Sequence, residues 1–238
     1  MDITTTRVIH QTTGAALSPE LTYDSKRKLL HAKPVWRGWM HLMGFEVSLV
    51  VGTLLVAHAH GATRSVAAGI YAGTVSGLLG TSALYHRGNW SAGMHRVLQR
   101  LDHVMIFLLI AGTSTPVFLL VTPDPVGVTL LGVIWGLTGI AMLIHLVWMD
   151  APEVLVGATF IGLGCVGGAA LPFVWVHAGI AAFALMLAGG VLYATGAVLY
   201  HRRWPDPVPT VFGFHEVFHA FVSAGACAQY VAIAILII

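Results

Sequence analysis

Long apolar stretches separated by short polar connections run through most of the chain. A helix needs roughly 20 mainly apolar residues to cross a bilayer. Proline-containing connections, such as those at 122–125 and 204–207, end one helix before the next begins. The pattern predicts an all-α, polytopic membrane protein, a bundle of seven transmembrane helices at residues 38–58, 66–86, 102–122, 126–148, 154–174, 178–200 and 214–237. Residues 1–37 are predicted to form a polar, basic N-terminal segment, and residues 38–238 the transmembrane domain.

Composition agrees with this class, and charge gives the bundle an orientation. The chain is 57% hydrophobic and 9% charged, whereas soluble domains carry about a quarter charged residues. On the predicted topology, eleven of the twelve lysines and arginines lie on the side of the N-terminus, and Arg64 lies on the other. Positive residues favour cytoplasmic loops. We therefore expect the N-terminus in the cytoplasm, the C-terminus outside, and the protein in the plasma membrane.

The composition and net charge indicate lipids as the binding partners. A net charge of +2 is too small to indicate binding to nucleic acid. The predicted partners are membrane lipids, and the sequence names no protein partner. The basic run at 26–28 could rest on anionic lipid, but a simple positive-inside anchor is the favoured interpretation.

Polar residues from three distant segments are predicted at one membrane depth. The second helix ends at His86, the third begins at Asp102, and the seventh begins near His215 and His219. Two histidines four residues apart share one face of a helix and can bind one metal. His86 would supply a third imidazole and leave one position open for water, as in a catalytic zinc site. Zn2+ is therefore the predicted cofactor, with Asp102 as a partner of the bound water and Ser82 as its support.

Two other kinds of metal site fit parts of this pattern less well. The stretch 215–219 matches the H-E-x-x-H pattern of zinc proteases, but no Asp, Glu or His follows His219, so a third downstream ligand is missing. Glu216 is interpreted as an interfacial residue rather than a general base. Two histidines with Asp102 would resemble an iron site, ranked below zinc because of His86. The remaining helix-end histidines are interpreted as interfacial residues, namely His41, His58, His60, His95, His103, His145, His177 and His201.

Taken in order, these motifs resemble the signature of the hemolysin III family. The resemblance rests on Ser82-x-x-x-His86, Asp102 and the run 213–219, and it covers the chain from about Arg37 to the end. That family is grouped with the progestin and adipoQ receptors, which include the adiponectin receptors, and more widely with alkaline ceramidases. One departure lies in the first helix, where Trp39-Met40-His41 lacks the polar neighbours of many relatives and Glu46 comes later.

The resemblance implies a seven-helix bundle with zinc near the cytoplasmic face. Its ligands would be His86, His215 and His219, Asp102 would contact the zinc water, and Ser82 would support it. Members of the group are thought to include hydrolases of lipid amides such as ceramides, and the family name comes from a haemolytic activity.

Three functional hypotheses follow. The leading one is a zinc-dependent hydrolase of a membrane lipid amide or ester. The second is a non-enzymatic membrane sensor or lipid-homeostasis protein with structural zinc. The third is a hemolysin-type pore, which the strongly apolar helices disfavour. A retinal protein is excluded because no lysine follows Lys33, and a G-protein-coupled receptor would have its N-terminus outside.

Overall fold

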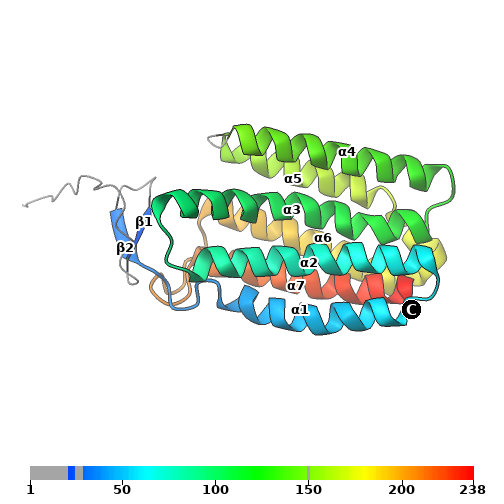
Figure 1. Cartoon of the computed structure of the whole chain (residues 1–238), viewed down its shortest axis with the longest axis horizontal. Coiled ribbons are helices and arrows are strands. Elements are labelled where there is room, and N and C mark those ends of the chain that lie inside the picture. Colours follow the sequence, from blue (N-terminus) through cyan, green and yellow to red (C-terminus); the bar gives the residue numbers. More distant parts are fainter. Residues whose placement is uncertain (1–20, 25–28, 149–150) are drawn as a thin grey trace, which may run out of the picture.

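The structure, a computed structural model, describes residues 21–24, 29–148 and 151–238. These residues form seven α-helices that lie side by side (Figure 1), preceded by two short β-strands. The elements are β1 (Leu21–Asp24), β2 (Leu29–Ala32), α1 (Trp39–His58), α2 (Ala62–Arg87), α3 (Ala92–Leu120), α4 (Val126–Val147), α5 (Glu153–Gly168), α6 (Leu171–Arg202) and α7 (Phe214–Ile237).

Six of the helices are long and apolar enough to cross a membrane, namely α1 to α4, α6 and α7. Large apolar side chains are exposed along these helices, among them Leu54, Leu143, Val147, Val176 and Ile180. Extensive apolar surface of this kind is rare on monomeric soluble proteins but suits a surface that faces lipid. The prediction of an all-helical, polytopic membrane domain is confirmed.

The fifth predicted helix is shorter in the structure. It was expected over 154–174, but α5 ends at Gly168 and has 16 residues. At 1.5 Å per residue it is about 24 Å long, which is less than the roughly 30 Å of a hydrocarbon core. The long helix α6 is itself interrupted at Gly179, whose φ of 82° is not helical. Glycine accepts such an angle without a Cβ clash, so a break does occur close to the predicted boundary between 174 and 178.

The third helix begins ten residues earlier than predicted, at Ala92 rather than residue 102. The Ser91 hydroxyl accepts a hydrogen bond from the Met94 N–H at 3.4 Å and caps this start. The first three turns carry arginines, which end the apolar pattern but do not interrupt a helix. Asp102 therefore lies within α3 and not at its first residue.

Part of the segment predicted as a polar tail is attached to the bundle. Strands β1 and β2 pair antiparallel, with Leu21 opposite Ala32; residues 1–20 and 25–28 lie outside the described residues. Residues 33–38, which we call the N-terminal strap, follow the strands. The Val35 N–H donates to the Thr210 carbonyl at 3.2 Å and the Trp36 N–H to the Val211 carbonyl at 3.1 Å. The strap is thereby fixed to the connection between α6 and α7.

Helices close to one another in the bundle meet through small residues. α6 packs along α7, and α1 lies beside both α2 and α7. At the α6–α7 interface a Cβ added to Gly189 would lie 3.1 Å from the Gly225 carbonyl oxygen. Such contacts let membrane helices approach closely. Small residues thus set the close approach of α6 to α7, and α1 contacts both α2 and α7, the two helices that carry the three histidines of the candidate site.

Candidate metal centre

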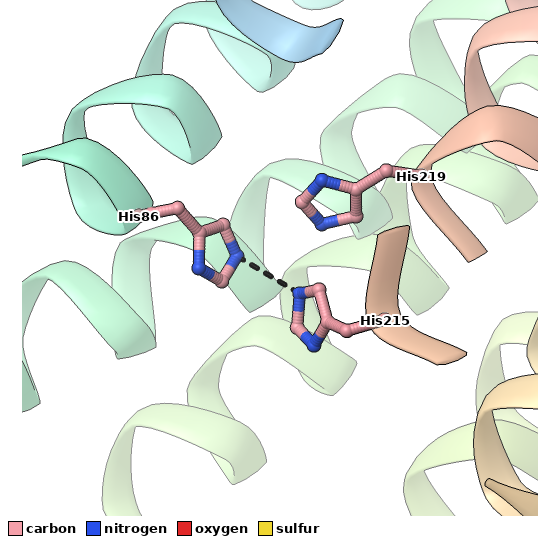
Figure 2. Close-up of side chains that lie close together, drawn as sticks. All are labelled: His86, His215 and His219. Carbon is pink, nitrogen blue, oxygen red and sulfur yellow. Dashed lines mark hydrogen bonds between the residues drawn. The ribbon is translucent and has the colours of Figure 1, made fainter. Parts of the chain in front are cut away.

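Three histidines converge where the end of α2 meets the start of α7. His86 lies in the last turn of α2, and His215 and His219 lie in the first two turns of α7. Their ligand nitrogens all lie within 4.8 Å of one another, and the Nε2 atoms of His86 and His215 are 3.2 Å apart. Figure 2 shows the three rings turned toward a common centre. The structure thus brings together the three imidazoles that the sequence grouped.

The cluster is enclosed by protein. His86 is 7% exposed and His219 is 2% exposed, while His215 is half-buried. Buried polar groups in native proteins are normally satisfied by partners. Three imidazoles placed together in an apolar bundle therefore need either hydrogen bonds to one another or a shared cation.

The spacing of the three histidines fits a transition metal. Two nitrogens bound to one tetrahedral zinc at 2.0–2.1 Å are separated by about 3.4 Å, close to the 3.2 Å between His86 and His215. A set of three neutral nitrogen donors suits zinc better than Mg2+ or Ca2+, which prefer oxygen. The group that could hold a metal consists of three histidines, without a carboxylate, which favours zinc over the two-histidine iron alternative.

Asp102 and Ser82 lie beside this cluster. One carboxylate oxygen of Asp102 is 3.9 Å from Nε2 of His86, too far for a direct hydrogen bond. The Ser82 hydroxyl donates a hydrogen bond to the Asp102 carboxylate. Ser82 is 2% exposed and precedes His86 by one helical turn. The carboxylate is thus held next to the cluster.

Glu216 corrects one interpretation made from the sequence. It was expected at the membrane interface, but its side chain is 0% exposed. One of its oxygens accepts a hydrogen bond from the Gly213 N–H at 2.9 Å, and the other pairs with Arg37 at 2.5 Å. A carboxylate in the first turn of a helix satisfies a free backbone N–H and suits the helix dipole. Glu216 therefore fixes the start of the helix that carries His215 and His219.

A fourth histidine was missed. His41, expected at the interface, is 3% exposed, and its ring stacks on His219 with centroids 3.9 Å apart and planes at 7°. Both of its ring nitrogens are buried without a hydrogen-bond partner. His103 and His145 were also expected at the interface, but they contact each other at 3.1 Å between α3 and α4. The only sequence signal for His41 was its place at the start of the first helix, the depth at which His219 also lies.

These features define a polytopic helical membrane protein with a buried three-histidine cluster at one end of the bundle. The family described as Haemolysin-III related matches this chain over residues 30–230, which include the strap and all residues of the cluster, and the chain belongs to that family. It is 29% identical over 192 residues to "Hemolysin-3" of Bacillus cereus, covering 80% of this chain and 85% of that relative. It is 28% identical over 134 residues to the "Hemolysin-3 homolog" of Bacillus subtilis (strain 168), covering 56% and 60% of the two chains.

Proposed function

We propose that this protein is a zinc-dependent hydrolase that acts on an amide or ester of a membrane lipid. The observation that carries the proposal is the buried cluster of His86, His215 and His219 with the Asp102 carboxylate 3.9 Å away. When bound, zinc supplies a water of pKa about 7 and a Lewis acid for the substrate carbonyl. Three protein ligands with one open position are typical of catalytic rather than structural zinc.

The residues of the site would have three roles: metal binding, proton transfer and positioning. The three histidines would hold the metal. Asp102 would accept the proton of the attacking water and return it to the leaving amine or alcohol. In balance, the acyl C–N or C–O bond breaks, the acyl carbon gains the hydroxyl of water, and the leaving group gains the proton. Ser82 would keep the Asp102 carboxylate in place through its hydrogen bond.

We infer further that α5 together with residues 171–178 makes a seventh crossing, with the N-terminus in the cytoplasm. The non-helical Gly179 separates this stretch from the remainder of α6. The end of the bundle with the cluster also carries Lys33, Arg37 and Arg87, as expected of a cytoplasmic face. The cluster would then lie at the depth of the inner headgroups, within reach of the carbonyl groups of lipids.

Metal content is the first test. Plasma mass spectrometry on protein purified without chelators should find about one zinc per chain in the wild type. The variant His215→Ala/His219→Ala should lose it. The matched control is His58→Ala/His177→Ala, since both of these histidines are exposed and each bonds to a carbonyl of its own helix. Its zinc content should equal that of the wild type. A wild type without metal would refute the proposal.

Turnover is the second test. Amide and ester lipids should release fatty acid in a zinc-dependent manner, and Asp102→Asn should keep its zinc while losing roughly 10²–10⁴-fold in rate. Zinc binding without turnover across the lipid panel would support the sensor hypothesis, with zinc as a structural link between α2 and α7. Ion flux through pure liposomes would support the pore hypothesis.

A further inference from the structure

An apolar groove lies at the start of α1, next to the metal centre but outside it. It is lined by Val35, Trp36, Trp39 and Met43 and has a volume of about 240 Å³. All four side chains are between 40% and 63% exposed. Two of them belong to the N-terminal strap and two to the first turns of α1. The groove is therefore formed where the strap meets the first helix that is apolar enough to cross a membrane.

Cationic side chains gather at the same place. The guanidinium group of Arg87 lies 3.6 Å from the centre of the Trp39 ring, so a positive charge stands on one wall of the groove. Burial, with the positive charges of Arg37 and Arg87 nearby, lowers the pKa of Lys33. Arg37 is paired with Glu216. Like charges held together in a partly buried site repel one another, and an anion bound beside them would relieve that repulsion.

Gly38 adjoins both the groove and the metal centre. Gly38 lies between the two strap residues and the two α1 residues of the groove, in a left-handed conformation with φ of 77°. A Cβ added there would lie 2.9 Å from the Cβ of His86 and 2.9 Å from the Cγ of Arg87. A molecule in the groove would therefore be separated only by Gly38 from the last turn of α2, which carries His86.

We propose that the groove binds one anionic phospholipid of the surrounding membrane. Its acyl chain would lie along Trp36, Trp39 and Met43, and its phosphate between Lys33 and Arg87. A zwitterionic lipid offers the same chain but cancels its phosphate with a headgroup cation, so the charges at this groove select the anionic class. Tryptophan and long cationic side chains suit such a site, because each joins an apolar body to a polar or charged end.

This site goes beyond the proposed hydrolase, because lipid binding needs neither metal nor turnover. The experiment uses the full chain in nanodiscs made of phosphatidylglycerol and phosphatidylcholine, with bromine on the acyl chains of one lipid at a time. Bromine quenches tryptophan fluorescence on contact. The chain has seven tryptophans, so the signal of the groove is taken as the difference between the wild type and Trp36→Phe/Trp39→Phe.

We expect brominated phosphatidylglycerol to quench this signal at a mole fraction roughly fivefold lower than brominated phosphatidylcholine does, since one basic residue near a membrane changes lipid affinity by about this factor. Lys33→Glu should abolish the preference. Lys33 precedes α1, so the substitution leaves the helices intact. Arg64→Glu makes the same change of charge at the opposite end of α1 and α2 and should keep the preference. Quenching of equal strength by both lipids, or a preference unchanged in Lys33→Glu, would overturn the proposal.

The same measurement on His215→Ala/His219→Ala separates the two proposals. Lipid selection that persists in this variant shows a binding site independent of metal. A wild type that selects the anionic lipid but contains no zinc would refute the hydrolase and leave the lipid site standing. A wild type that contains zinc but shows no lipid preference would refute the lipid site and leave the hydrolase proposal standing.

Discussion

Arg37 and Glu216, which are 179 positions apart in the sequence, form an ion pair in which Nε of Arg37 donates to Oε1 of Glu216 at 2.5 Å. The Arg37 side chain is 16% exposed and that of Glu216 is 0% exposed. The pair joins the N-terminal strap to the first turn of α7, between the two histidines that this helix contributes to the cluster. The acidic residue of the H-E-x-x-H pattern is thus a structural residue here, because it connects the strap to the start of α7.

The ion pair predicts a non-additive double substitution. Arg37→Met leaves a buried carboxylate without its cation and should lower the free energy of unfolding by about 3–5 kcal/mol. Arg37→Met/Glu216→Gln removes both charges but keeps an oxygen that can accept from the Gly213 N–H. The double variant should therefore recover most of the loss. Unfolding by SDS in mixed micelles, followed by circular dichroism, measures both; a double variant as unstable as the single one would show that the pair does not balance the buried charge.

Two glycines with a positive φ allow a second test. Gly38→Ala and Gly61→Ala should each lose about 1–3 kcal/mol of folding stability, because φ is 77° and 88° at the two positions and side chains rarely adopt a positive φ. A Cβ at Gly61 meets nothing within 4 Å, whereas at Gly38 it meets His86 at 2.9 Å. Only Gly38→Ala should therefore also weaken zinc binding, in a competition titration with a chromophoric chelator. Equal zinc affinity in both variants would show that the strap does not position His86.

The sequence predicted those parts of the structure that depend on local periodicity. Apolar stretches located six membrane helices, and the four-residue spacing of His215 and His219 placed both rings on one face of α7. Hydropathy failed at the start of α3, because it marks the part of a helix that faces lipid, whereas the Ser91 cap and backbone hydrogen bonds extend the helix through Arg96 and Arg100. It also could not resolve the bends at 169–170 and Gly179.

What the sequence could not predict are contacts set by the rotation of one helix against another. His41 looked like other histidines near helix ends, and only the packing of α1 against α7 brings its ring onto His219. Arg37 looked like one of several basic residues before the first helix. Its pairing with Glu216 depends on the strap returning to the connection between α6 and α7, and no local pattern encodes that return.

Two adjacent glycines in α6 test the packing of the bundle. A Cβ at Gly189 would lie 2.5 Å from Cγ of Gln229 and 3.1 Å from the Gly225 carbonyl oxygen, whereas at Gly190 it would meet nothing within 4 Å. Gly189→Ala should therefore push α6 from α7 and destabilise the protein by about 1–3 kcal/mol. Gly190→Ala should stabilise it by up to about 1 kcal/mol, the difference in helix propensity. SDS unfolding measures both, and equal effects would contradict the close approach of the two helices at Gly189.

Removal and return of zinc should change the stability of the whole bundle. The cluster joins residues that are 129 positions apart, at the end of α2 and the start of α7, and a ligand that binds only the folded state stabilises it. Zinc returned to chelator-treated protein at about 100 times its dissociation constant should add about 2.7 kcal/mol to the free energy of unfolding. His86→Ala should lose this gain and His58→Ala should keep it. Mg2+ should not replace zinc, because it prefers oxygen ligands in an octahedral arrangement. Stabilisation of His86→Ala as large as that of the wild type would mean that zinc acts elsewhere on the protein and that the three imidazoles are held by hydrogen bonds alone.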